Sequence, residues 1–193
     1  MTPTIVADQM HAALSANPVA AVKIGMIGSE GTVTALARIL REQPGIPIVL
    51  DPVLASTSGA ALLPRRAVAT LKRDLLPLCT LVTPNLLELA ILTRTAPAKD
   101  EEEAVQQGYE LLGASCGAVL VKGGHMSGAD STDILIRPGH EIARFSARRS
   151  AHGVRGTGCM LASAIAACLA RNIIVEESVR KAKEYVLQKF DYP

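Results

Sequence analysis

The sequence has few aromatic residues and no tryptophan. Its 193 residues include three tyrosines and two phenylalanines. Proteins that bind single-stranded nucleic acid stack the bases on aromatic side chains, so this shortage argues against such a partner. The sequence also has no large excess of positive charge, because 20 basic and 18 acidic residues leave a formal net charge of +2. Since the phosphate backbone is bound through clustered lysine and arginine, we expect no nucleic-acid partner.

Long apolar runs and paired cysteines are also missing. No apolar stretch reaches the roughly 18 residues of a membrane span, and the N-terminus lacks the basic start and apolar core of a signal peptide. The four cysteines show no Cys-x-x-Cys spacing and the four histidines stand apart, which argues against a structural zinc site. These features predict a cytoplasmic protein with free thiols and no membrane contact.

Composition and hydrophobic pattern predict one α/β domain over residues 1–193. With 49% hydrophobic and 20% charged residues, the chain can bury a core of ordinary size. Short apolar runs alternate with longer amphipathic stretches, the pattern of β-α units around a mostly parallel sheet with helices on both faces. "STDILIRP" and "HEIARFSA" predict an antiparallel pair that turns at Pro138-Gly139. We expect strands over residues 20–28, 46–53, 79–85 and 117–124, and helices over 31–43, 64–76, 85–93, 101–112, 175–190 and after Gly158.

Polar residues follow the predicted strands at the edge where an α/β protein binds its ligand. In open α/β sheets, the ligand site lies beyond the carboxyl ends of the strands. The residues at this edge are therefore the candidates for chemistry. They are Asp51, Thr83, Asn85, Glu88, Lys122 and the segment Gly156–Cys159.

The turn Gly156-Thr157-Gly158 stands directly before Cys159 and a predicted helix. Glycines there leave backbone N–H groups free to point at an anion such as a phosphoryl group in transfer, which the positive end of the helix also favours. The same field is expected to lower the pKa of Cys159, whose thiolate could then take a proton from a substrate hydroxyl. Taken alone, the turn is explained better by close packing, with Cys159 a small buried apolar residue.

The segment "TPNLLE" places Asn85 and Glu88 one helical turn apart. Their amide and carboxylate oxygens suit a hydrated magnesium ion held against phosphates. The alternative is helix capping, in which Asn85 or Thr83 caps the helix and Glu88 complements its dipole. These residues alone leave both interpretations open.

The segment "VKGGH" places Lys122 at a strand end beside two glycines. This position suits neutralisation of a phosphate, although a single lysine is more often a solvated charge. His125 could act as a base or face solvent. Three weak signals at three strand ends together favour phosphoryl transfer, in which positioning and charge neutralisation do most of the catalysis.

Five segments of the chain resemble the hydroxymethylpyrimidine/phosphomethylpyrimidine kinases of thiamine biosynthesis, in order and approximate spacing. This resemblance covers almost the whole chain from about Val6 and implies the ribokinase-like three-layer αβα sandwich. The cysteine after Gly-Thr-Gly is its specific part, because related sugar kinases usually, and pyridoxal kinases typically, carry aspartate there. The segments are "KIGMIGS", "DPVLASTSG", "LVTPNLLELAILT", "AVLVKGGH" and "GTGCMLASAIAA".

By this resemblance, the chain uses ATP and Mg²⁺ to phosphorylate 4-amino-5-hydroxymethyl-2-methylpyrimidine and then its monophosphate. Cys159 would be the general base. Met26 and Val53 would line the pyrimidine pocket, although ordinary core positions explain these two apolar residues equally well. The remaining implied roles are an anion hole of Gly156, Thr157 and Gly158, nucleotide contacts from Thr83, Asn85 and Lys122, and magnesium ligands from Asp51 and Glu88.

The chain departs from the family pattern in two places. Family members begin with a strand, a "GAGIQAD"-like segment and a substrate-covering portion, and this chain starts at roughly the helix that follows them. We therefore expect an uncovered apolar sheet edge or face, protected by another chain or by rearrangement, and we expect a homodimer. Arg155 stands where these kinases usually have histidine, and it either adds charge at the phosphate site or is an exposed substitution.

Other functions stay open. The chain could be a catalytically weak or inactive nucleotide- or pyrimidine-binding homologue, because the missing portion carries polar residues that clamp the pyrimidine. It could also be a pyridoxal kinase-like enzyme. A cysteine hydrolase fits poorly, since no Cys-His-Asn spacing supports it.

Overall fold

The computed structural model describes residues 1–55, 60–113, 116–123, 130–148 and 156–190. A six-stranded sheet with the strand order β1-β2-β3-β4-β5-β6 forms its centre. The first four strands run parallel, β5 is antiparallel to β4, and β6 is antiparallel to β5. The strands are β1 (Val22–Ile24), β2 (Ile48–Leu50), β3 (Leu81–Val82), β4 (Val119–Val121), β5 (Asp130–Ile136) and β6 (Ala143–Arg148).

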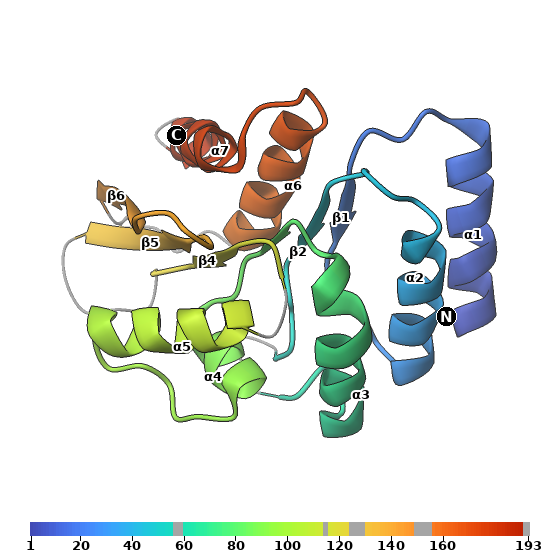
Figure 1. Ribbon diagram of the computed structural model, residues 1–193, viewed down its shortest axis with the longest axis horizontal. Helices are drawn as coiled ribbons and strands as arrows, with labels where there is room; N and C mark the ends of the chain where they lie inside the picture. The colour runs from blue at the N-terminus through green and yellow to red at the C-terminus, as the bar shows by residue number, and fades with distance from the viewer. Residues whose placement is uncertain (56–59, 114–115, 124–129, 149–155, 191–193) are drawn as a thin grey trace.

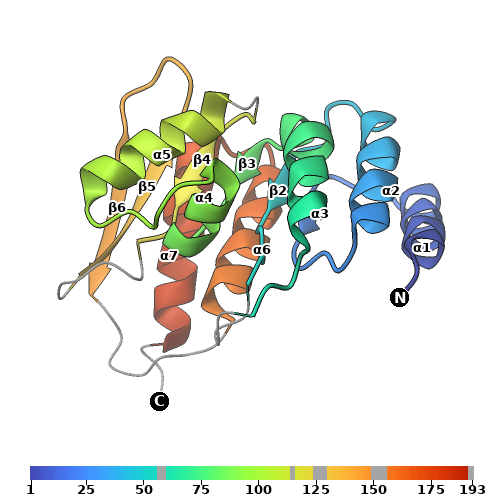
Figure 2. The same ribbon diagram turned by 90° about the horizontal axis from the view of Figure 1, so that it is seen from below.

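Helices cover both faces of this sheet (Figure 1). Helices α2 to α5 lie on one face, and α6 and α7 lie on the other. Helix α1 packs against α2 and ends the row of helices that Figure 2 shows running from α5 to α1. The helices are α1 (Pro3–Ala16), α2 (Glu30–Arg41), α3 (Arg65–Thr70), α4 (Leu86–Thr93), α5 (Glu101–Gly113), α6 (Thr157–Leu169) and α7 (Val175–Phe190).

Two apolar layers result from the alternation of side chains along the strands. Ile48 and Leu50 of β2 belong to the core under α2 to α5, whereas Val49 between them packs with residues of α6 and α7. Successive side chains of a strand point to opposite faces, and all three residues are buried because both faces are covered. The predicted three-layer αβα sandwich with a mostly parallel sheet is therefore confirmed.

The predicted helix over residues 64–76 differs most from the structure. Its regular part is α3, and the chain continues as one wide helical turn over Leu71–Leu75 and a tight turn over Leu76–Leu78. Pro77 explains the change of pitch, because proline lacks a backbone N–H and its ring clashes with the carbonyl four residues earlier. The prediction treated this stretch as one regular helix and was wrong on that point.

The other elements lie close to their predicted positions, and the antiparallel pair β5–β6 is confirmed. The four parallel strands are shorter than predicted, since only their central residues pair. The residues beyond those pairs, Asp51 among them, form the loops at the carboxyl edge of the sheet. In the described ranges, no helix combines the length and the apolar character that crossing a membrane requires.

Candidate active site

The strand geometry brings three of the predicted site residues to one face of the sheet. Leu50, Val82 and Val121 end β2, β3 and β4, and all three are buried on the side of α2 to α5. The residue after each of them points the other way, toward α6. These following residues are Asp51, Thr83 and Lys122.

Lys122 joins the two acidic residues of the site. Its Nζ donates to Asp51 Oδ1 at 2.7 Å and lies 3.9 Å from Glu88 Oε2. The side chains of Asp51 and Glu88 are 2% and 6% exposed, and that of Lys122 is 14% exposed. Burying a carboxylate is costly unless it is paired, so Lys122 offsets the cost of placing both acids here.

Asn85 and Glu88 form a reciprocal capping box at the start of α4. Asn85 Oδ1 accepts from the Glu88 N–H at 2.9 Å, and Glu88 Oε2 accepts from the Asn85 N–H at 2.8 Å. Burial raises the pKa of Glu88, while Lys122 and the Asn85 N–H oppose that rise. The box engages one of the two carboxylate oxygens, so capping and metal binding by Glu88 are compatible.

Thr83 lies behind Asp51 and is fully buried. Its hydroxyl is 3.4 Å from Asp51 Oδ1 and 3.5 Å from the Leu50 carbonyl oxygen. It does not cap α4, since Asn85 holds that position. Thr83 thus lies beside Asp51, and its nucleotide contact stays a prediction.

Helix α6 begins at the predicted glycine turn, opposite these side chains. Gly156 is its N-cap and has a φ of 87°, in the left-handed region that glycine adopts without strain. Glycine offers no side-chain acceptor, so Gly156 supplies no side-chain cap to the first turn, and N–H groups at such a helix start suit an anion. A Cβ on Gly158 would lie 3.0 Å from Lys122 Nζ, which places the ammonium directly beside this turn.

Cys159 is exposed in the first turn of α6, which contradicts the interpretation of Cys159 as a small buried residue. The predicted lowering of its pKa is also wrong for this structure. Partial burial raises the pKa of Cys159, and a hydrogen bond to Asp51 and the charge of Asp51 raise it further. Lys23 and Lys122 oppose this rise without cancelling it. Burial is the largest of these causes, and the two contributions of Asp51 add to it.

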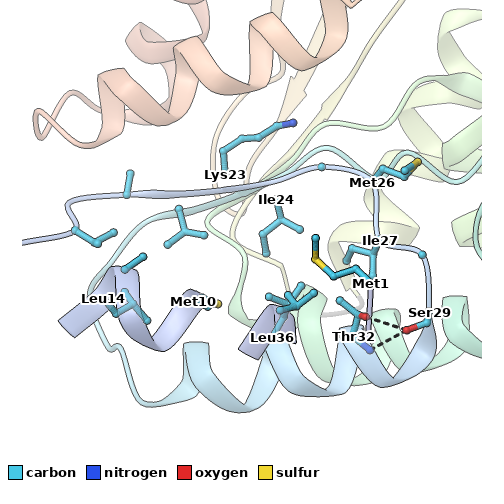
Figure 3. Close-up of a pocket in the computed structure, with 17 residues that line it drawn as sticks. Met1, Met10, Leu14, Lys23, Ile24, Met26, Ile27, Ser29, Thr32 and Leu36 are labelled. Carbon is cyan, nitrogen blue, oxygen red and sulfur yellow. Dashed lines mark hydrogen bonds between the residues drawn. The ribbon is translucent and has the colours of Figure 1, made fainter. Parts of the chain in front are cut away.

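Lys23 is absent from the residues that the sequence predicts for the site. It lies on β1 between Val22 and Ile24, which both pack on the side of α2 to α5, so its side chain faces the side of α6. Figure 3 shows this lysine on the opposite side of β1 from Ile24. The signal available in the sequence was the alternation along "KIGM", which turns the lysine and the glycine two positions later to the same face.

Met26 and Val53, predicted to line a pyrimidine pocket, follow β1 and β2. Met26 is 65% exposed, which excludes an ordinary core position for this residue, and Val53 is half-buried. Met26 lines a groove of about 830 Å³ that runs along β1 between α1 and α2, and the groove also contains Met10 and Leu36. Val53 does not line this groove and instead lines a small pocket beside Leu54 and Leu63.

A magnesium site can be tested against the donors that are present. Within the described ranges, no group of three or more His, Cys, Asp and Glu residues is placed to hold a metal ion. Magnesium in phosphate-transfer sites is usually held by one or two carboxylates together with substrate phosphates and water. Asp51 and Glu88 provide two carboxylates on either side of Lys122, so the residues fit this kind of site. Two other residues from the sequence analysis, His125 and Arg155, lie outside the described residues.

Comparisons with known proteins agree on one family. The family model described as phosphomethylpyrimidine kinase matches residues 1–192. The hydroxymethylpyrimidine/phosphomethylpyrimidine kinase of Rhizobium meliloti is 45% identical over 183 residues, which are 94% of this chain and 68% of that protein.

Solved structures give the same picture of the fold. The crystal structure of phosphomethylpyrimidine kinase from Clostridium difficile 630 matches with a TM-score of 0.83 and 30% identity, covering 98% of this chain and 77% of the other. The pyridoxal kinase from Staphylococcus aureus in complex with AMP-PCP matches with a TM-score of 0.88 and 25% identity, covering 98% and 68%.

Proposed function

This chain belongs to the phosphomethylpyrimidine kinase family, and from that premise we propose that it transfers phosphate from ATP to 4-amino-5-hydroxymethyl-2-methylpyrimidine and then to the resulting monophosphate. The observation that carries the proposal is the convergence of Asp51, Glu88 and Lys122 opposite the start of α6, where Gly156 supplies no side-chain cap. Buried carboxylates paired with an ammonium, beside the backbone N–H groups of a helix start, suit the charge of a transferring phosphoryl group.

Cys159 is the proposed acceptor of the hydroxymethyl proton. It lies in the first turn of α6 and interacts with Asp51. In the first step, the hydroxyl oxygen forms a bond to the γ-phosphorus while the bond from that phosphorus to the β-γ bridging oxygen breaks, and the hydroxyl proton passes to the Cys159 thiolate. Two of the causes that raise the pKa of Cys159 come from Asp51, so compensation of that carboxylate by a cation favours the thiolate.

The other residues bind and orient the phosphates in this proposal. Gly156, Thr157 and Gly158 form the anion hole, Lys122 contacts the nucleotide phosphates, and Asn85 holds Glu88 in position. Asp51 and Glu88 would hold magnesium, which supplies neutralisation of phosphate charge when it is bound. Removing any one of these contributions weakens the stabilisation of the transition state, because the chemistry depends on electrostatics and positioning.

The deciding experiment is an ATP-dependent phosphorylation assay with the purified 193-residue chain, followed by mass spectrometry, with pyridoxal as a competing substrate. We expect mono- and diphosphate of the pyrimidine. The Cys159→Ala variant should lower kcat by about 100- to 10,000-fold, the usual contribution of a general base, while its affinity for MgATP changes little. Binding of MgATP without any product would instead identify a nucleotide-binding homologue that does not catalyse the reaction.

Pyridoxal phosphorylation is the second candidate, because solved pyridoxal kinases match the fold closely. Cys159 argues against it, since pyridoxal kinases typically carry aspartate at this position. A higher kcat/KM for pyridoxal than for the pyrimidine in the competition assay would reverse the preference.

A further inference from the structure

We propose that Lys23 is a substrate-binding residue that holds the phosphate of the pyrimidine monophosphate during the second phosphorylation. This inference rests on the proposed function and adds a residue that distinguishes the two acceptors. In the first step the acceptor is a neutral hydroxymethyl group, and in the second it is a phosphate. A site that serves both needs a cation at the acceptor end that only the second substrate engages.

The position of the ammonium carries the argument. A Cβ built on Gly25 would lie 2.8 Å from Lys23 Nζ, so the lysine extends along β1 into the space that a larger residue at position 25 would fill. The Asp51 N–H donates to the carbonyl of Ile24, the last residue of β1, at 2.8 Å, and Gly25 follows directly after it. The ammonium therefore lies at the carboxyl end of the strand, on the side that faces α6.

The charge of Lys23 is not used within the described structure. No hydrogen bond or ion pair to its Nζ is present among the described residues, although the side chain is half-buried. By contrast, Lys122 is bound to Asp51. A half-buried ammonium retains only part of its hydration, so an anion that reaches it replaces water with a charge-assisted hydrogen bond.

Lys23 lies at the acceptor end of the site. Strand β1 contacts α6, and the charge of Lys23 lowers the pKa of Cys159 in the first turn of that helix, so the ammonium faces the helix start where the acceptor oxygen must lie. Lys122 stands at the end of β4, whereas Lys23 stands on β1, three residues before the exposed Met26. Lys122 Nζ lies beside Gly158 and Lys23 Nζ beside Gly25, so in this proposal Lys122 serves the nucleotide and Lys23 the pyrimidine monophosphate.

Electrostatics makes this cation more important for the second step than for the first. The monophosphate brings its negative charge into a site that already contains Asp51, Glu88 and the phosphates of ATP. Like charges at contact distances repel strongly where water is partly excluded. An unpaired ammonium on the acceptor side reduces this repulsion and fixes the acceptor phosphate, whereas a hydroxymethyl group gains little from it.

The test compares Lys23→Met with the wild type on both acceptors. We expect the KM for the monophosphate to rise about 10- to 100-fold, the loss of one hydrogen bond between charged groups, and the KM for the hydroxymethyl compound to change less than about threefold. Lys23→Arg should restore most of the affinity, because it keeps the charge. Lys181→Met is the matched control, since Lys181 is half-exposed on α7 and pairs with Glu177.

A second variant tests position without removing the charge. Gly25→Ala places a methyl group 2.8 Å from the ammonium, which is too close, and the end of a flexible lysine side chain can move away at little cost in stability. We expect the same selective rise in KM for the monophosphate, with unchanged circular dichroism and thermal unfolding. An equal rise in KM for both acceptors in either variant would assign Lys23 to the nucleotide or to Cys159 and overturn the proposal. An unchanged KM for the monophosphate would overturn it as well.

Calorimetry keeps this inference separate from the proposed function. If the wild type phosphorylates neither acceptor, the proposed function fails, and titration of the pyrimidine monophosphate into the wild type and Lys23→Met then decides the role of Lys23. Tenfold weaker binding by the variant supports the proposal. Equal binding, or no binding to the wild type, contradicts it.

Discussion

At the scale of single residues, the chemistry of the site depends on what surrounds Asp51. This carboxylate accepts a hydrogen bond from Lys122, lies 3.4 Å from the hydroxyl of Thr83 and raises the pKa of Cys159. Neither the glycine turn nor the helix start alone sets the state of the thiol. Burial and the Asp51 carboxylate both raise the pKa of Cys159, so its activation depends in part on how the charge of Asp51 is compensated.

Alkylation of Cys159 by iodoacetamide at a series of pH values tests this account. Because the thiolate is the reactive form, the raised pKa places the midpoint above the range of an ordinary thiol, and the rate increases as the pH passes through it. Asp51→Asn should lower the midpoint, since it removes two of the causes of the rise. Peptide mass spectrometry separates Cys159 from the buried Cys79 and Cys116. An unchanged midpoint in Asp51→Asn would show that burial alone sets the pKa.

At the scale of elements, α4 serves both stability and the site. Its capping box fixes Glu88 by satisfying backbone N–H groups at the helix start, and that carboxylate approaches Lys122 at the end of β4. The position of Glu88 beside Lys122 therefore depends on a local helix signal. The sequence predicted both roles of Glu88 as alternatives, and the geometry makes them compatible.

Two variants separate these roles of α4. Asn85→Ala should lower the free energy of unfolding by about 1 kcal/mol, the usual loss for an N-cap. Glu88→Gln keeps an acceptor for the Asn85 N–H, so it should cost less stability and instead raise the magnesium concentration needed for half-maximal activity. Denaturant unfolding and magnesium titration measure the two effects, and an unaltered magnesium titration in Glu88→Gln would leave Glu88 as a cap only.

The pH dependence of stability, compared between the wild type and Glu88→Gln, gives a further measure of the role of Glu88. Its pKa in the folded chain is raised above the ordinary value of 4.5, so the folded chain holds this proton more tightly than the unfolded chain. The contribution of Glu88 to the free energy of unfolding therefore decreases as the pH rises through that raised pKa. The difference between wild type and Glu88→Gln should follow this curve.

At the scale of the whole molecule, β1 is a strand at the edge of the described sheet and pairs there only with β2. The groove beside it is lined mainly by apolar side chains, and the nearby Met26 and Ile5 are exposed. Exposed edges of this kind favour association with another strand. The homodimer that the sequence led us to expect stays a prediction.

Sedimentation equilibrium of the purified chain tests that prediction. We expect a mass of twice 20.3 kDa at micromolar concentration, because pairing of two copies covers the edge of β1 and part of the apolar groove. A monomer at every concentration would rule out this form of protection.

The sequence by itself determined the order of elements, the parallel sheet and the positions of Asp51, Glu88, Lys122 and Gly156 at strand ends and helix starts. These follow from local pattern, because alternation, caps and glycine turns act within a few residues. Only the tertiary structure decided that Thr83 is buried behind Asp51, that the pKa of Cys159 is raised and that Lys23 faces the site. Those facts depend on distances between β1, β2, β4 and α6, which lie far apart in the sequence and meet only when the sheet has formed.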